Sequence, residues 1–139
     1  MNASLAPALA KIVGARWVRH RPSERATFRS DGLPTHEATP GLVVLPGTRD
    51  EVIRVVRLLY LAQVPFVARG AGTGLSGGSL ADEDSVLITL TRLTKVLAIH
   101  PERRRAVVEP GVVNAHLSTA AAPFGLHYAP DPSSQTACT

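Results

Sequence analysis

The residues with the clearest chemical meaning form a glycine-rich stretch, Arg69 to Gly78, which reads R-G-A-G-T-G-L-S-G-G. Five of its glycines fall within nine residues, and the stretch follows a short apolar run at 66–68. Glycine lets backbone amides approach a ligand closely, and several converging amides form a site for an anion such as phosphate. The pattern therefore predicts a phosphate-binding loop at the end of a β-strand.

A dinucleotide motif of the Rossmann type fits the same letters less well. Gly72, Gly74 and Gly77 match G-x-G-x-x-G, but that motif must open a helix that crosses over to the next parallel strand. Too few residues lie between Gly78 and the apolar run at 86–90 to make such a crossover. The loop therefore needs a different fold around it.

A hydrolase nucleophile is a second alternative, because the letters around Ser76 satisfy G-x-S-x-G. That pattern requires a strand directly before the serine and a helix directly after it, and neither is expected here. The P-loop pattern is absent, since no Gly-Lys-Ser or Gly-Lys-Thr occurs. A purely structural loop stays open, because glycine clusters also form tight turns.

The elements that position the loop can be predicted from the apolar pattern. The β-branched run at 42–45 indicates a buried strand. Thr48 then begins a capping box, in which its hydroxyl binds the Glu51 amide and the Glu51 carboxylate reaches back to the Thr48 amide. The following apolar stripe predicts an amphipathic helix ending near Gln63. Strand, helix and the strand at 66–68 form a βαβ unit, whose strands run parallel.

The rest of the chain predicts shorter elements. We expect a first helix at 3–13, extended connections around short elements at 14–40, a strand at 86–90, an antiparallel hairpin at 96–99 and 106–109, a small helix at 114–123, and a turn at 130–134. Residues 1–40 form an N-terminal helix and connection, and 41–139 form the main domain.

Composition restricts the function classes. The net charge is +4, but the arginines are spread along the chain and only 4% of residues are aromatic, which argues against a nucleic-acid interface. The single cysteine, Cys138, suits a reducing compartment. No apolar run reaches the length of a membrane span. The first 23 residues contain no acid, which leaves a transit peptide as an alternative to a short helix.

Residues 28 to 139 resemble the FAD-linked subunit of bacterial glycolate oxidase, a member of the vanillyl-alcohol oxidase flavoprotein superfamily. The ten-residue glycine stretch and the P-D-P-S-S run are the most distinctive parts of the match. The matching stretches are Asp31-Gly32, 42–46, Val64-Pro65, 69–78, 108–112 and 128–135.

The resemblance implies an α+β fold, the PCMH-type FAD-binding domain. We expect a first subdomain with a small parallel βαβ sheet and the incomplete start of a second, antiparallel subdomain. The implied cofactor is FAD. By resemblance, the residues that bind it are Arg69, Gly70, Ala71, Gly72, Thr73, Gly74, Gly77, Gly78, Ser79, Pro110, Gly111, Pro130, Asp131, Ser133 and Ser134. Some relatives attach the flavin to a histidine where this chain has Thr73, so we expect dissociable FAD.

The implied chemistry is hydride transfer from a 2-hydroxy acid, such as glycolate or D-lactate, to the flavin. The family pattern continues after Thr139, so we expect this chain to be the N-terminal portion, with no catalytic residue, no metal site and no turnover on its own. Its unfinished second subdomain predicts self-association. By resemblance, the partners include an iron–sulfur subunit, and the location is the cytoplasm, with peripheral attachment to the inner membrane through partner subunits.

Three readings stay open at this point. The chain is either a working part of a 2-hydroxy-acid dehydrogenase or an inactive remnant of that family. A basic nucleic-acid-binding module is the third reading, and a strongly salt-dependent affinity for nucleic acid would support it.

Overall fold

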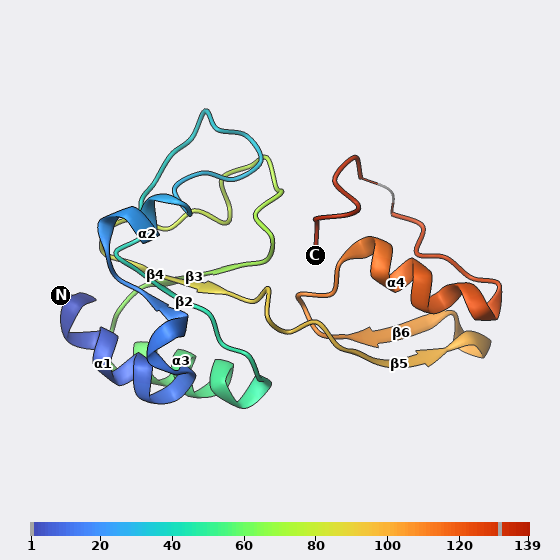
Figure 1. Ribbon diagram of the computed structural model, residues 1–139, viewed down its shortest axis with the longest axis horizontal. Helices are drawn as coiled ribbons and strands as arrows, with labels where there is room; N and C mark the ends of the chain where they lie inside the picture. Colours follow the sequence, from blue (N-terminus) through green and yellow to red (C-terminus); the bar gives the residue numbers. More distant parts are fainter. Residues whose placement is uncertain (1, 131) are drawn as a thin grey trace.

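The computed structural model describes residues 2–130 and 132–139, with the backbone alone at 2–4. The chain forms two lobes (Figure 1). The first lobe contains α1 (Asn2–Val13), η1 (Ala15–Trp17), β1 (Val18–Arg19), α2 (Pro22–Ala26), β2 (Leu42–Val44), α3 (Arg49–Leu61), β3 (Phe66–Arg69) and β4 (Val86–Thr89). The second contains β5 (Val96–His100), η2 (Pro101–Arg103), β6 (Arg105–Val108), α4 (Asn114–Ala121) and η3 (Ala122–Phe124).

The sheet of the first lobe has the strand order β1-β2-β4-β3. Strands β2 and β3 each pair in parallel with β4, so that Leu42 and Phe66 both lie opposite Val86. Strand β1 runs antiparallel to β2. The predicted parallel βαβ unit is confirmed, with β4 inserted between its two strands. Strands β2 and β4 are buried along their whole length, which explains their unbroken apolar sequences.

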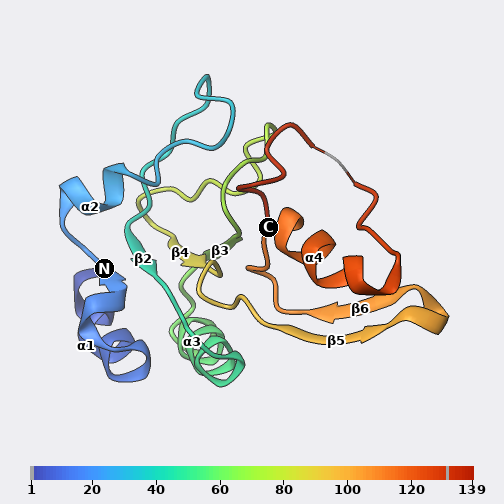
Figure 2. The ribbon, with the colours of Figure 1, turned by 45° about the vertical axis from the view of Figure 1, so that its right-hand side comes forward.

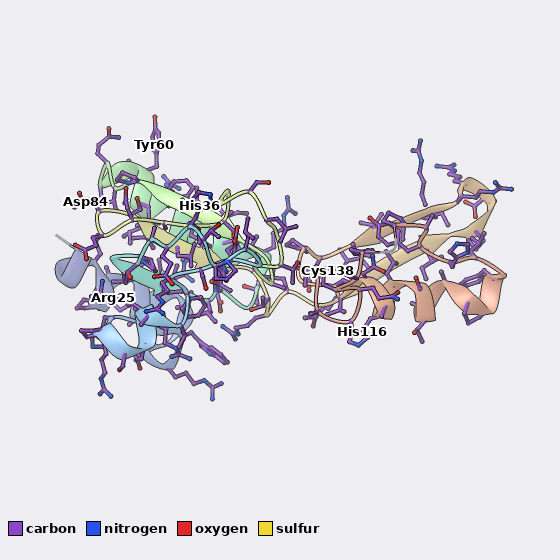
Figure 3. All side chains as sticks on the ribbon, turned by 90° about the horizontal axis from the view of Figure 1, so that it is seen from above. Arg25, His36, Tyr60, Asp84, His116 and Cys138 are labelled. Atoms are coloured by element: carbon purple, nitrogen blue, oxygen red, sulfur yellow. The ribbon has the colours of Figure 1, made fainter. Side chains whose placement is uncertain are left out.

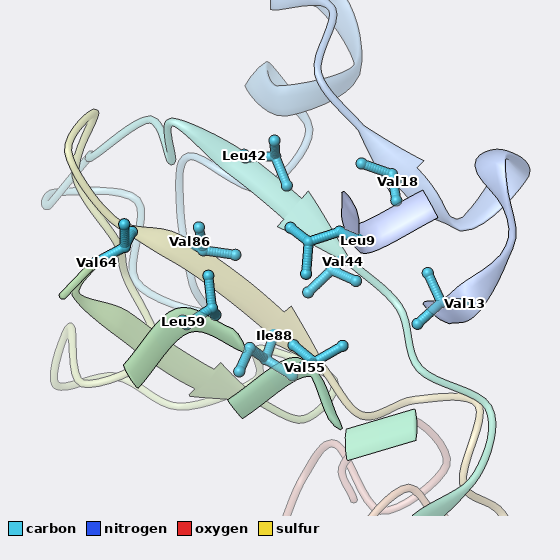
Figure 4. Packing of buried hydrophobic residues seen from close by; sticks show 10 residues of the cluster. All are labelled: Leu9, Val13, Val18, Leu42, Val44, Val55, Leu59, Val64, Val86 and Ile88. Atoms are coloured by element: carbon cyan, nitrogen blue, oxygen red, sulfur yellow. The ribbon is translucent and has the colours of Figure 1, made fainter. Parts of the chain in front are cut away.

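Alternate residues of the central strands pack into clusters on opposite faces of the sheet. Leu42 and Val44 join Val86 and Ile88 in one cluster, where α3 and α1 cover them (Figure 4). The other cluster contains Val43, Leu45, Ala81 and Leu87, with Phe28 packed against it. The N-terminal helix completes the first cluster, because its Leu9 is fully buried there.

The start of α3 follows the predicted cap in part. The Thr48 hydroxyl accepts a hydrogen bond from the Glu51 amide at 3.1 Å, as predicted. The predicted return contact was wrong, because the Glu51 carboxylate accepts from the Gly47 amide at 2.6 Å instead of the Thr48 amide. The carboxylate therefore binds the amide one residue before the N-cap.

Arg92 ties the end of β4 to three other segments. Its guanidinium lies 3.7 Å from the centroid of the Trp17 ring, and its Nη1 donates to the Leu45 carbonyl at 2.7 Å. The Glu51 carboxylate lies 4.0 Å from the same nitrogen. A Cβ atom at Gly47 would come closer to this guanidinium than van der Waals contact allows, so a larger residue there would displace the Arg92 side chain.

The second lobe is an antiparallel β5–β6 hairpin with α4 beside it (Figure 1). The predicted hairpin is confirmed, with His100 and Arg105 as its last paired residues. Large apolar side chains stay exposed on this lobe, including Leu97 and Val107. None of the helices in the described part of the chain combines the length and apolar character that crossing a bilayer requires.

Replacing Leu9 tests whether the N-terminal helix belongs to the core. We expect Leu9→Ala to lower the free energy of unfolding by about 2–5 kcal/mol, because it leaves a cavity among fully buried neighbours. Urea unfolding followed by circular dichroism measures the change. The matched control is Leu61→Ala, a leucine that is 71% exposed, and its effect should stay within about 0.5 kcal/mol. Equal effects for the two variants would contradict the packing described here.

Candidate functional site

The glycine loop begins where β3 leaves the sheet. The last paired residues are Arg69 of β3 and Thr89 of β4, and the Arg69 carbonyl also accepts from the Leu90 amide at 2.8 Å. The chain then turns back on itself and encloses an open hollow of about 310 Å³. The hollow is lined by Gly70, Ala71, Gly72, Thr73, Gly74, Leu75, Ser76, Gly78 and Ser79, together with Asp31 and Thr139.

The backbone amides of this loop are largely unpaired. Within the residues that the structure describes, the amides from Gly72 to Ser76 donate to no protein acceptor. On either side, the Ala71 amide donates to the Thr139 hydroxyl at 3.1 Å and the Gly77 amide donates to Asp31 at 2.9 Å. Unpaired amides clustered in a loop are the donors that an anion requires.

Steric space and an unpaired hydroxyl also indicate a polar ligand in this hollow. A Cβ atom built on Gly74 or Gly78 would meet no heavy atom within 4 Å, so both glycines face open space. The Ser79 hydroxyl is buried and has no hydrogen-bond partner among the described residues. A buried hydroxyl without a partner costs free energy, which a bound acceptor would offset.

The Arg69 side chain lies under the loop, outside the lining of the hollow. It is 9% exposed, and its Nη2 donates to the Ser30 carbonyl at 2.9 Å. The guanidinium also lies 6.0 Å from the Phe28 ring centroid and fills the space where a Gly72 side chain would stand. Burial lowers the pKa of Arg69, and the nearby Asp31 charge opposes that shift. Arg69 therefore supports the loop, and its direct contact with a cofactor stays a prediction.

Asp31 reaches the loop from the connection between α2 and β2. Its carboxylate accepts from the Leu33 amide at 2.9 Å and from the Gly77 amide at 2.9 Å. These bonds, that from Leu33 above all, hold the pKa of Asp31 below its ordinary value of 3.8, with the Arg69 charge adding to the effect. The carboxylate is therefore ionised at neutral pH.

A second open hollow, of about 520 Å³, adjoins the first. Pro110, Pro130 and Pro132 line it, and Thr139 lines both hollows. The returning C-terminal segment creates this junction, because it runs from the end of α4 back to the glycine loop (Figure 2). Its Cys138 carbonyl accepts from the Asn114 amide at 3.0 Å, which fixes the segment to the start of α4.

Three further predicted site residues, Gly111, Ser133 and Ser134, lie apart from the hollows. Gly111 is buried, and a Cβ there would come within 2.6 Å of the Leu90 carbonyl, so this glycine allows close packing of the two lobes. Ser133 and Ser134 belong to the turn at 133–137, and neither lines the hollows of the described chain. Asp131 lies outside the described residues.

Sequence reasoning missed the contacts that the segment from Phe28 to Asp31 makes with the loop. The resemblance included Asp31-Gly32 but gave the pair no role. A signal was present, since an acid and a glycine stand together in a connection otherwise lacking a pattern. Its partner Gly77 lies 46 residues later, and no periodicity in the sequence relates the two positions.

Comparison with known families decides the identity of the domain. Residues 40–139 match the model of the FAD binding domain. The chain belongs to this family. The cofactor of this domain is FAD, as expected, and the hollow with unpaired amides at the glycine loop fits its pyrophosphate.

Individual relatives agree with this assignment. The chain is 44% identical over 136 residues to the glycolate oxidase subunit GlcD of Escherichia coli (strain K12), which covers 98% of the chain and 27% of that protein. It is 32% identical over 96 residues to the D-lactate dehydrogenase of Archaeoglobus fulgidus, which covers 69% of the chain and 21% of that protein. The chain thus spans about a quarter of the length of these relatives.

The fold has a solved counterpart. In p-cresol methylhydroxylase with substrate bound, the likeness has a TM-score of 0.74 at 19% identity and covers 90% of this chain and 25% of that one. The expected α+β fold of PCMH type is therefore confirmed, as is the resemblance to the glycolate oxidase family. The domain is therefore an FAD-binding domain, and its relatives are FAD-linked oxidoreductases.

The lowered pKa of Asp31 has a consequence for stability. A carboxylate whose folded pKa is depressed contributes stability that is complete above the unfolded pKa and is lost as pH falls through the folded value. We expect the melting temperature of wild type to exceed that of Asp31→Asn from pH 7 down to the ordinary value of 3.8, and the gap to close below it. Thermal melts between pH 7 and pH 3 measure this gap.

Asp84→Asn is the control for the loss of one negative charge, since Asp84 is exposed and has no hydrogen bond in the described part of the chain. A gap between wild type and Asp31→Asn that persists unchanged to pH 3 would contradict the hydrogen-bonded carboxylate.

Proposed function

We propose that the glycine loop binds the FAD pyrophosphate through its backbone amides, in the cofactor-binding portion of an oxidoreductase acting on a 2-hydroxy acid. The observation that carries the proposal is the run of unpaired amides from Gly72 to Ser76, facing a hollow of about 310 Å³. A pyrophosphate loses its hydration on binding, and preorganised donors compensate that loss.

Charge supports the same assignment. The Arg69 guanidinium lies directly beneath Gly72 and places a positive charge below the amides. Asp31 is the acid that lines this hollow, and its carboxylate is engaged by the Leu33 and Gly77 amides. An anion in the hollow therefore meets donors more closely than it meets the carboxylate charge.

The second hollow offers space for the rest of the cofactor. Thr139 lines both hollows, so a dinucleotide with its pyrophosphate at the glycine loop can extend past Thr139 toward Pro110 and Pro130. In this arrangement Thr73 lines the first hollow. Threonine has a hydroxyl in place of an imidazole, so it cannot form the covalent bond that a histidine makes to a flavin. We propose that FAD is held without a covalent bond.

The substrate class comes from the relatives, whose names specify glycolate oxidase and D-lactate dehydrogenase. When bound, FAD supplies the acceptor for a hydride from the carbinol carbon of a 2-hydroxy acid. The residues of this chain bind and orient the cofactor. Subunits beyond this chain belong to the proposal because GlcD is a subunit by name. That one of them carries iron–sulfur clusters is what the resemblance to the glycolate oxidase family implies.

The carboxylates that line the two hollows of the described chain both hold backbone segments in place. Asp31 and Glu109 line the hollows, and each carboxylate already accepts from a backbone amide, that of Gly77 or of Lys95. No histidine lines either hollow in the described chain. We therefore propose cofactor positioning, without substrate turnover, as the task of these residues. The exposed Leu97 and Val107 of the hairpin support self-association through the second lobe.

An FAD titration tests the proposed binding site. We expect saturable binding of one FAD per chain, followed by flavin fluorescence, and its loss in Gly74→Leu. Gly74 has no positive φ and no heavy atom near its Cβ position, so leucine fills the hollow with little strain on the protein. Gly74→Ala should weaken binding less, because a single methyl occupies less of the hollow.

Ala62→Leu provides the control, since it adds the same bulk at an exposed position after α3. If Gly74→Leu and Ala62→Leu both bind FAD as tightly as wild type, the glycine loop is not the cofactor site.

Anaerobic mixing with substrate tests the division of labour. We expect neither glycolate nor D-lactate to bleach the visible absorbance of the oxidised flavin when added to the FAD-loaded chain. The physical reason is that no histidine of the described chain lines the hollows, and the carboxylates there hold backbone amides. Dithionite should bleach the same sample, which shows that the bound flavin is reducible. Bleaching by glycolate or D-lactate at a rate near that of a full-length relative would overturn this part of the proposal.

A further inference from the structure

A segment that lies before the matched family region packs against the glycine loop. The family model begins at residue 40, whereas Asp31 lines the hollow formed by residues 70–79. We call residues 28–33 the clamp segment. It connects α2 to β2, and its contacts with the loop come from backbone carbonyls, a backbone amide and the Asp31 carboxylate.

Asp31 holds the turn at the far end of the loop. Its Oδ2 accepts from the Gly77 amide at 2.9 Å, and Gly77 has φ of 73°, in the left-handed region. Its Oδ1 accepts from the Leu33 amide at 2.9 Å, which fixes the carboxylate relative to its own backbone. The carboxylate is therefore oriented before it meets the loop.

Gly32 holds the middle of the loop by direct backbone contact. Its amide donates to the Gly74 carbonyl at 2.9 Å. A Cβ atom at this position would lie 2.7 Å from the Thr73 carbonyl oxygen and 3.0 Å from that of Gly74. These atoms belong to the backbone and cannot swing aside, so only glycine permits the approach.

The Gly74 contact also determines which way the loop faces. Because the Gly74 carbonyl accepts from Gly32, that peptide directs its oxygen toward the clamp segment. In a trans peptide the N–H points away from the C=O, so this bond directs the Leu75 amide away from the clamp segment. At the start of the loop, the Arg69 guanidinium is held by the Ser30 carbonyl and fills the space next to Gly72.

We propose that Asp31 and Gly32 are positioning residues of the FAD site, which hold the glycine loop in the conformation that presents its amides to a phosphate. Neither residue has to touch the cofactor for this role. Asp31 acts through Gly77, and Gly32 acts through Gly74. The functional unit of the site then begins near residue 28, and a version of this domain starting at residue 40 would lack it.

An acid beside an anion site has a cost that this geometry limits. The Asp31 carboxylate accepts from two amides, and the Arg69 guanidinium is close enough to lower its pKa. Charge-assisted hydrogen bonds are about twice as strong as neutral ones, so an aspartate fixes the Gly77 amide better than an asparagine would. The benefit to the loop conformation should therefore exceed the repulsion of the phosphate.

The inference rests on the proposed function for its effect on FAD, but its effect on the loop can be measured without any ligand. The first arm is amide NMR of the 139-residue chain without FAD, comparing wild type, Asp31→Asn, Asp31→Ala and Gly32→Ala. We expect the Gly77 resonance to shift and the Gly77 amide, which loses its acceptor, to exchange faster with solvent in Asp31→Ala. Gly32→Ala should perturb Thr73 and Gly74 instead, because it pushes the backbones apart without altering any charge.

The second arm is FAD titration of the same variants. We expect the dissociation constant to rise about tenfold to a hundredfold in Asp31→Ala, the loss associated with a charge-assisted hydrogen bond. Asp31→Asn should lose less, because its one amide oxygen still accepts from a single donor. Asp84→Ala and Asp84→Asn are matched controls, since Asp84 is exposed and lines neither hollow. It lies at the opposite end of the first lobe from Cys138 (Figure 3).

The outcomes separate the inference from the proposed function. Weaker FAD binding in the order Ala then Asn, with NMR changes confined to 72–78, supports the inference. Unchanged FAD affinity in Asp31→Ala overturns the inference, whatever the melting temperature of the variant. Tighter FAD binding in Asp31→Asn overturns it too, because it would show that repulsion between the carboxylate and the phosphate dominates. If wild type fails to bind FAD, the proposed function fails, and the ligand-free NMR arm alone decides whether Asp31 and Gly32 hold the loop.

Discussion

A phosphate-binding loop needs backbone amides that are held in place and yet unpaired, and this requirement governs the site. A loop of five glycines in nine residues has a high conformational entropy when free, so something must fix it from outside. The structure fixes it at its two ends and at its middle. Arg69 ends β3 under the loop, Asp31 bonds Gly77, and Gly32 bonds Gly74. The amides between these points stay available for a ligand.

The parallel sheet provides the rigid base for that arrangement. Strand β4 lies between β2 and β3 and is buried along its length, so the point where the glycine loop leaves the sheet is set by packing on both faces. After this strand ends, the chain continues through Arg92. The stacking of Arg92 on Trp17 anchors the path to the second lobe. The C-terminal segment then returns to the loop, where the Thr139 hydroxyl meets the Ala71 amide. Two hollows that share Thr139 result from this return.

Local patterns predicted much of the fold because the information is local. The bond from the Glu51 amide to the Thr48 hydroxyl, the buried strands and the hairpin each depend on neighbours within a few residues, and the structure confirms them. The insertion of β4 between β2 and β3 could not be predicted in this way, since strand order depends on how distant segments pack. Neither could the contact between Asp31 and Gly77. For the site, glycine spacing predicted a phosphate loop, the resemblance supplied FAD, and the supporting role of the clamp segment required the three-dimensional structure.

The central claim is that the unpaired amides of the glycine loop receive the pyrophosphate. Amide NMR of the chain during an FAD titration tests it most directly, with ³¹P spectra of the cofactor recorded on the same samples. The account predicts that the largest shifts fall on the amides from Gly72 to Ser76 and that both pyrophosphate resonances move at the same stoichiometry. Shifts concentrated instead at the hollow between α1 and α2, lined by Ala10, Val18 and Arg25, with the loop amides unmoved, would contradict it.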